Sequence, residues 1–252
     1  MFVVKTNQIS ALRLSEFEME MVAHVREFFP NHFFSMQETG TRNTIQYGYL
    51  NAKKYGFNTQ RNVCLYLNNM LVLGSNFDID PQYPWAIEIL NDKKEKDPRQ
   101  RADKLTDKML NIFGRITGPR EIDINYALHN LNNNSADIFQ NIMNSQLKDV
   151  LPFLKTQYPK KYEVIGESNL NQLMKMAKAK VIDYGITSEP NIVMFIMFMF
   201  LCGAGFDKDP QFPWAFRILS DLELKDENQK SKLLFDKAIN NLGLFLTQYK
   251  YK

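Results

Sequence analysis

Apolar residues recur at helical spacing along most of this chain. Between residues 17 and 29 they fall on one helical face, and Pro30 follows, so we expect a helix that ends before this proline. Ser15 and Glu18 form a capping-box pattern at the expected start of that helix. Because no stretch alternates apolar and polar residues for long, we expect little or no sheet and predict an all-α protein.

Capping and stop residues predict the other helices. We expect a helix from about Thr41 to Tyr55, which Gly56 ends in the left-handed conformation. Thr59 is expected to cap a third helix that ends at Gly74. The remaining predictions are helices over Pro84–Asp92, Pro98–Arg115, Ile122–Leu131 and the segment from Ser188 to Gly203, a loop at Asn132–Asn134, a helix capped by Ser135, and a break or kink at Pro152.

One sequence pattern occurs twice, 129 residues apart. Residues 74–92 and 203–221 are identical at 12 of 19 positions, where chance gives roughly one match. Solenoid repeats have periods of about 20–50 residues, so a repeat of this length indicates a duplicated domain. We therefore predict two tandem homologous helical domains, residues 1–118 and 119–252, of about five to six helices each. A pseudo-twofold and a translational packing of the two copies both remain open.

Charge and composition argue against several classes of protein. The net charge is only +3, and acidic residues interrupt the densest basic run, Lys93–Lys108, so we expect no nucleic-acid interface. Residues 1–7 lack the features of a signal peptide, and the two cysteines lie at non-equivalent positions, which favours free thiols and the cytoplasm. The eleven apolar residues Ile192–Cys202 fall short of the roughly 20 that span a bilayer, so we expect no membrane span.

The two copies differ in their third helix. Asn68 and Asn69 of the first copy align with Met197 and Phe198 of the second copy. The second-copy helix is therefore apolar on every face and requires cover on every face. Packing against the other domain is the expected cover, and a partner protein is the alternative.

The repeated loop is the main candidate site. In a structural interpretation, Asp80 caps a turn before Pro81, Pro84 starts the next helix, and Trp85 fills the core. A cation between paired carboxylates is an alternative, but the further ligands of an EF-hand loop are missing, so we predict no metal. In the third interpretation the loops form a protein-contact surface. Its predicted residues are Asp78, Asp80, Tyr83, Trp85, Asp207, Asp209, Phe212 and Trp214.

Signals for catalysis are weak. The three histidines, His24, His32 and His129, do not occupy equivalent positions in the two copies. Metal-binding spacings of His or Cys, glycine-rich phosphate loops and the Gly-x-Ser-x-Gly motif are all missing. We predict no catalytic residue and no cofactor, and therefore a protein that is not an enzyme.

The shared pattern resembles a known family. The residues that carry the resemblance run from Tyr55-Gly56 through Phe77-Asp78-x-Asp80-Pro81 to Pro84-Trp85-Ala86-x-x-Ile89-Leu90-Asn91-Asp92. They are similar to those of small bacterial helical proteins encoded beside type VI secretion spike, PAAR-type tip and toxin genes. The resemblance covers residues 15–115 and, more loosely, 145–245. Its members match one copy only, and they have no established catalytic residue to carry over.

This resemblance implies a non-enzymatic protein-binding module of the cytoplasm. The expected role is an accessory, adaptor or chaperone-like factor for a secreted bacterial toxin or spike protein, which would be the partner. An immunity protein that neutralises a cognate toxin is one alternative. A hydrolase-type enzyme that uses the loop carboxylates is the alternative from a different class.

Overall fold

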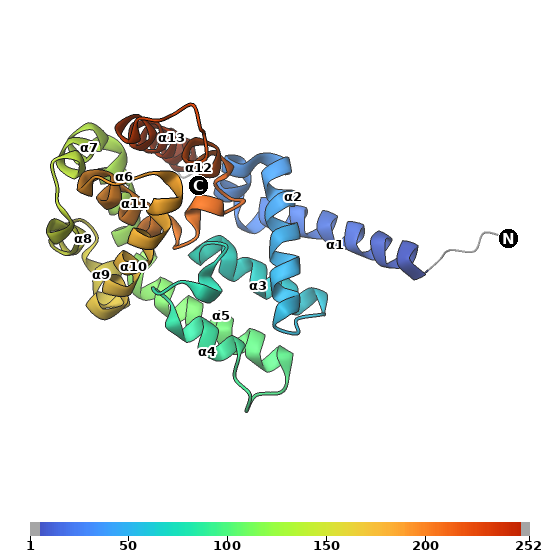
Figure 1. The fold of residues 1–252 in the computed structure, drawn as a ribbon. Coiled ribbons are helices and arrows are strands. Elements are labelled where there is room, and N and C mark those ends of the chain that lie inside the picture. Colours follow the sequence, from blue (N-terminus) through green and yellow to red (C-terminus); the bar gives the residue numbers. More distant parts are fainter. Residues whose placement is uncertain (1–5, 248–252) are drawn as a thin grey trace.

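The described part of the chain is all-α, as predicted. The computed structural model describes residues 6–247, with side chains from residue 15 to residue 246. This part contains 13 α-helices and no strand, and 81% of it is helical. Figure 1 shows two groups of helices side by side, which we call the first half (residues 6–117) and the second half (residues 135–247).

Five α-helices and one 3-10 turn make up the first half. They are α1 (Thr6–Phe28), α2 (Pro30–Lys54), α3 (Gln60–Leu73), η1 (Phe77–Ile79), α4 (Pro84–Leu90) and α5 (Pro98–Thr117). Helix α1 runs outward from the rest of the molecule (Figure 1). The first half is connected to the second by η2 (Pro119–Glu121) and α6 (Ile122–Asn133).

The second half has ten elements, and its last four repeat the order of α3, η1, α4 and α5. They are α7 (Ser135–Met143), η3 (Leu147–Asp149), α8 (Val150–Gln157), α9 (Pro159–Ile165), α10 (Glu167–Lys180), η4 (Val181–Tyr184), α11 (Glu189–Cys202), η5 (Phe206–Lys208), α12 (Pro213–Leu219) and α13 (Glu227–Thr247). A shift of 129 residues places α3 on α11 and α4 on α12, end to end. Helix α6 has no counterpart in the first half.

The helix break between α9 and α10 also has an equivalent in the first half. Gly166 ends α9 at φ +81°, and its equivalent within α2 is Gln37 at φ +57°. The left-handed region is easy for glycine and strained for glutamine. Helix α2 is therefore two helices joined at Gln37, and the prediction of a single helix from Thr41 missed its first part.

Several local predictions were wrong. Ser15 lies inside α1, which begins at Thr6, so the Ser15–Glu18 pattern is not a capping box. Ser135 is the first residue of α7, and α6 extends into the expected asparagine loop. Pro152 does not break α8 because it lies in the first turn, where its missing N–H is not needed. The cap at Thr59 is confirmed, since its hydroxyl accepts from the Asn62 N–H at 3.3 Å.

Two hydrophobic clusters lie one on each side of Gly118. The first draws its members from residues 17–113 and the second from residues 127–239. Helix α11 is the centre of the second cluster, and residues 193–200 are all buried. Its main neighbours are α10, α7 and α13. The cover of its extra face is therefore intramolecular, as expected, but it comes mostly from its own half and not from the other one.

Helices of the two halves also pack across the junction between them. Helix α5 contacts α9, and its equivalent α13 contacts α2, which contains the equivalent of α9. Helix α6 contacts both α5 and α13.

Among the described helices, none is by itself long and apolar enough to cross a bilayer; only α10 with η4 and α11 pass such a test together, as a pair bent by 116°.

Candidate functional site

The two copies of the repeated loop face each other and exchange hydrogen bonds. The Asp80 carboxylate accepts from the backbone N–H of Ala204 at 2.7 Å. The Asp209 carboxylate accepts from the backbone N–H of Ser75 at 2.8 Å. Asp209 is the equivalent of Asp80, and Ala204 is the equivalent of Ser75, so each half makes the same contact to the other half. Reciprocal contacts are typical of a twofold-related interface, which favours the pseudo-twofold over the translational packing.

Two glutamines make a second reciprocal pair of contacts. The Gln82 side-chain amide donates to the Met199 carbonyl at 3.0 Å, and the amide of Gln211 donates to the Met70 carbonyl at 3.1 Å. Met70 and Met199 lie in the last turns of α3 and α11, and the Met70 carbonyl also accepts from the Gly74 N–H at 2.9 Å. Each half thus donates a hydrogen bond to the last turn of the central helix of the other half. The sequence analysis did not single out these glutamines, although their identity in both copies was visible.

Two glycines allow this close approach. Gly74 and Gly203 end α3 and α11 with φ of +98° and +96°. A Cβ at Gly74 would lie 2.8 Å from the Cys202 carbonyl oxygen, and one at Gly203 would lie 2.9 Å from that of Leu73. Both the positive φ and the backbone contact exclude a larger residue.

The loop carboxylates at the junction are buried. Asp80 is 2% exposed and Asp209 is 3% exposed. Burial raises the pKa of each carboxyl from 3.8 to about 6, and hydrogen bonds, chiefly from Ala204 to Asp80 and from Ser75 to Asp209, oppose this rise. These groups hold the two halves together and do not face solvent.

A second pair of carboxylates anchors each loop to its own half. The Tyr55 hydroxyl donates to Asp78 at 2.6 Å, and the Tyr184 hydroxyl donates to Asp207 at 2.7 Å. Lys180 adds a salt bridge of 2.6 Å to Asp207, whereas in the first half the Tyr66 hydroxyl donates to Asp78 at 3.1 Å. The carboxylate and its first tyrosine donor are therefore the same in both halves, and only the second donor differs.

Most of the residues that were predicted to form a protein-contact surface lie in the interior of the molecule. Asp78, Asp80, Tyr83, Asp207 and Asp209 are buried, and Trp85, Phe212 and Trp214 are half-buried. The aromatic residues form two equivalent edge-to-face pairs, with ring centroids 6.2 Å apart for Tyr83 and Trp85 and 6.1 Å apart for Phe212 and Trp214. Apolar side chains that pack in this way serve the fold.

A basic residue, missed by the sequence analysis, clamps the backbone in both halves. The Arg101 guanidinium donates to the carbonyls of Tyr55 and Leu90. Its equivalent, Lys230, donates to the equivalent carbonyls at 3.1 Å each. A conserved positive charge at equivalent positions was the available signal.

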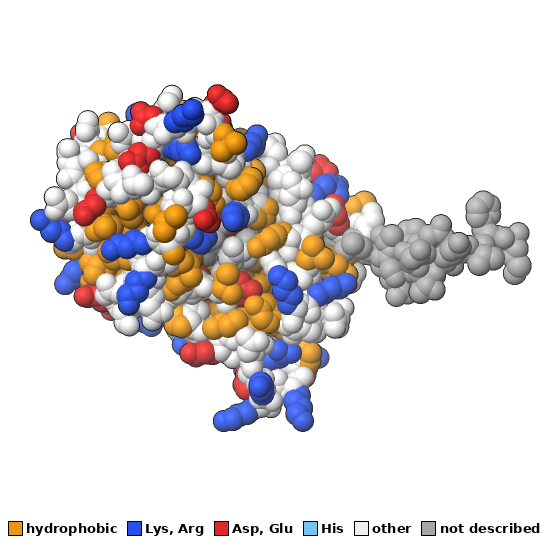
Figure 2. Space-filling view, in the orientation of Figure 1, with side chains coloured by type: hydrophobic (Ala, Val, Ile, Leu, Met, Phe, Trp, Pro, Cys, Tyr) orange, Lys and Arg blue, Asp and Glu red, His pale blue; other side chains and the backbone are white. Residues whose placement is uncertain are grey.

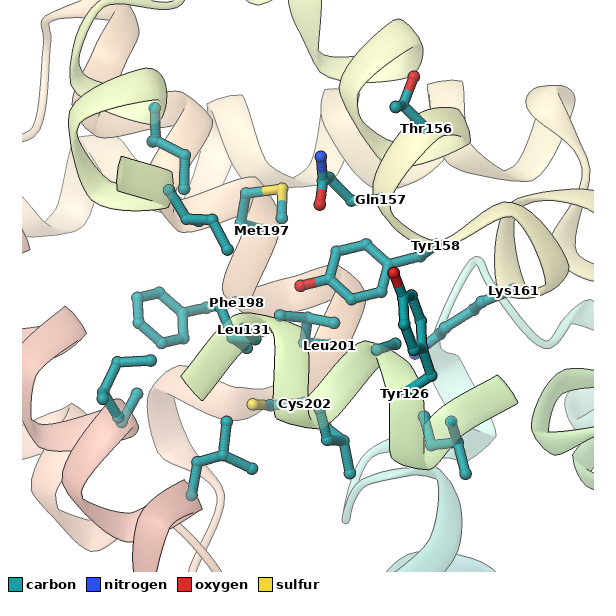
Figure 3. Close-up of a pocket in the computed structure, with 18 of the residues that line it drawn as sticks. Tyr126, Leu131, Thr156, Gln157, Tyr158, Lys161, Met197, Phe198, Leu201 and Cys202 are labelled. Carbon is teal, nitrogen blue, oxygen red and sulfur yellow. The ribbon is translucent and has the colours of Figure 1, made fainter. Parts of the chain in front are cut away.

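A cavity lies beneath α6, between this helix and the second half. It has a volume of about 400 Å³ and is lined mainly by residues of α6, α7, α8, α9, α11 and α13 (Figure 3). Most of its wall is apolar, including Leu131, Met197 and Leu201. Small-molecule sites are concave, mostly apolar and roughly 300–1,000 Å³ in volume, so this cavity is the best candidate for a ligand site.

A second cavity of about 260 Å³ adjoins the first. Lys161, Leu201 and Cys202 line both cavities. The second cavity also reaches the first half, through residues such as His32 and Leu71. The junction of the two halves is therefore hollow beside the buried loops.

Lys161 is the most unusual charged group in this region. Its ammonium donates to the Phe200 carbonyl and lies 4.7 Å from the centroid of the Phe200 ring. Burial lowers the pKa of Lys161 from 10.5 to about 8, while Asp80 and Cys202 act in the opposite direction. Lys161 forms no salt bridge with any carboxylate of the described residues.

His32 is the equivalent of Lys161 in the first half. Burial lowers the pKa of His32 to about 4, and a hydrogen bond with the backbone of Leu71 opposes this. Leu71 is the equivalent of Phe200, so the same backbone position receives both side chains. His32 is uncharged at neutral pH, whereas Lys161 retains its charge at pH 7.

The described residues at this site provide neither a metal-binding cluster nor a reactive thiol. No three His, Cys, Asp or Glu residues in the described ranges are placed to hold a metal ion. Burial raises the pKa of the Cys202 thiol to about 12, which disfavours the thiolate form.

Comparisons with protein-family models, with curated proteins and with solved structures give no match to this chain.

Proposed function

We propose that this protein is a non-enzymatic protein-binding module made of two homologous helical domains fused end to end. The observation that carries the proposal is the reciprocal loop contact. The pattern shared by the two copies holds a protein surface, that of the other copy, through Asp80, Asp209 and the paired glutamines. We infer that the chain descends from a one-domain protein that paired with a second copy of itself.

A hydrolase that uses the loop carboxylates has little support. Asp80 and Asp209 are buried and accept hydrogen bonds from backbone N–H groups, and Asp78 and Asp207 bond to tyrosines. A general acid or base has to reach the substrate atom that it protonates or deprotonates. These four groups are oriented into the protein.

The outer surface is left for a partner. Figure 2 shows apolar, acidic and basic side chains mixed over one face, with lysine and arginine gathered at the tip formed by the loop between α4 and α5. Lys93, Lys94 and Lys96 are exposed there, while neighbouring Glu95 pairs with Lys104 at 3.0 Å. The family resemblance names the expected partner class, a secreted bacterial toxin or a type VI secretion spike protein, met in the cytoplasm.

The test is purification of the tagged full-length chain from its native bacterium, followed by mass spectrometry and size-exclusion chromatography. We expect a toxin or spike protein in a stoichiometric complex, and an unrelated protein with the same tag as the control should not retain it. Protection of cells that express the recovered toxin would assign the immunity role in place of the adaptor role. A chain that elutes alone, with neither toxin nor spike protein recovered, would contradict the proposal.

A further inference from the structure

The cavity beneath α6 is an asymmetric feature of an otherwise repeated fold. Helix α6 has no counterpart before α1 in the described chain, and it lines the same cavity as Met194, Met197 and Leu201 of α11. The equivalent positions on α3 are Leu65, Asn68 and Val72, all half-buried. The equivalent face of α3 is thus partly polar and half-exposed, whereas the face of α11 borders a mostly apolar cavity.

Lysine is unexpected in the wall of this space. In Figure 3, Lys161 lies at one side of the view and Phe198 at the other, with Leu201 between them. The neighbouring Lys160 is exposed to solvent, but Lys161 is half-buried and contacts Phe200. An ammonium in apolar surroundings is unfavourable unless a charge or several hydrogen bonds compensate it. The described residues supply one carbonyl, one ring and the electrostatic attraction of Asp80, but no ion pair in direct contact with the ammonium.

The remaining polar groups of the larger cavity do not supply that charge either. Thr156, Gln157, Tyr126 and Tyr158 bring hydroxyl and amide groups to the wall, but no carboxylate. Asp123 also lines the cavity, but its carboxylate lies against Gly118 at the turn between α5 and α6. Two lysines line the cavity, but Lys160 is exposed, so Lys161 is the half-buried cation of the site and forms no ion pair with a described residue beside a long apolar wall.

From this arrangement we infer that the cavity binds a free medium-chain carboxylate, with its carboxylate on Lys161 and its alkyl chain along α6 and α11. A carboxylate would pair with the ammonium through a charge-assisted hydrogen bond. The apolar wall would remove the chain from water, which favours longer chains by about fourfold per methylene until the cavity is full. The inference does not depend on the proposed protein partner.

The experiment titrates the full-length protein with decanoate and with decanol, a neutral molecule of the same chain length, by isothermal titration calorimetry. We expect saturable binding of both, with decanoate at least tenfold tighter at pH 7. Lys161→Met should abolish this preference and retain decanol binding. Lys160→Met, which removes the adjacent exposed charge, is the matched control and should retain the preference.

A second variant tests the cavity itself. Ala127 lines the cavity from α6, so Ala127→Phe should fill part of it and weaken both ligands at least tenfold while the circular dichroism spectrum stays unchanged. Absence of saturable decanoate binding to the wild-type protein would overturn the inference. Equal affinities for decanoate and decanol, or equal effects of Lys160→Met and Lys161→Met, would also overturn it.

Discussion

The two halves share one set of residues, which forms the contact between them, and differ in another set, which lines the cavity beside that contact; Gly74 and Gln211 of the shared set also border this cavity. Glycine, aspartate and glutamine at positions 74, 80 and 82 recur at 203, 209 and 211, and all six form the contact between the halves. The pairs His32/Lys161 and Leu73/Cys202 differ, and all four residues line the second cavity. In a twofold contact the same residue is needed at the equivalent position of each half, so both positions are constrained together. The residues of the cavity wall make no such paired contact, and they can differ between the halves.

The largest expected effect comes from the glycines of the shared set. Gly74→Ala combined with Gly203→Ala should lower the free energy of unfolding by about 4 kcal/mol, because both positions have positive φ and no space for a Cβ. Urea unfolding followed by circular dichroism would measure this change.

The matched control uses another equivalent pair of glycines. Gly114 lies inside α5 and Gly243 lies inside α13. A Cβ at Gly114 would have no neighbouring atom within 4 Å, and a Cβ at Gly243 would lie 3.6 Å from the nearest atom, an ordinary van der Waals distance. Alanine at both should raise the free energy of unfolding by up to about 1 kcal/mol per site, since alanine favours helix. If both double variants lost stability equally, the junction would have no special role.

The buried aspartates predict a pH dependence of intermediate size. Burial raises the pKa of Asp80 and Asp209 to about 6 in the folded chain, so the folded chain binds more protons than the unfolded chain between about pH 4 and pH 6. The stability that these two groups contribute is complete below the unfolded pKa and is lost as the pH rises through about 6.

This dependence is isolated by comparison with Asp80→Asn/Asp209→Asn. Between pH 4 and pH 7 the wild-type protein should lose about 2–4 kcal/mol of unfolding free energy relative to that variant. The pKa of His32 is lowered to about 4 by burial, so its contribution to stability changes with pH in the opposite direction. Because His32 is present in both proteins, its contribution cancels in the comparison. If the unfolding free energies of the two proteins changed with pH in parallel, the pKa values of these aspartates would be the same in the folded and the unfolded chain, and the prediction would be wrong.

The smallest expected effect concerns the set that differs. Lys161→Met should raise the free energy of unfolding by about 1 kcal/mol at pH 7, because it removes a half-buried ammonium that forms no ion pair with a described residue. Lys160→Met should change it by less than about 0.5 kcal/mol, as is usual for exposed residues. A loss of stability in Lys161→Met would identify the lysine as a cap of the Phe200 carbonyl and not as a residue retained for a ligand.

The sequence by itself determined the all-α class, most helix positions and the 129-residue relation between the halves. These properties depend on periodicity, on caps such as Thr59 and on stop residues such as Pro30, all of which act within a few neighbouring residues. The local errors at Ser15 and Gln37 arose because short capping and turn patterns do not fix where a helix begins or breaks.

Only the tertiary structure decided what the repeated loop does. The partners of Asp80 and Asp209 lie 124 and 134 residues away along the chain, and no local pattern predicts contacts at such separations. The cavity beneath α6 and the position of Lys161 in its wall likewise depend on how α6 packs across the junction. Burial and charge compensation are properties of the packed molecule, because they depend on which surfaces meet after the helices have formed.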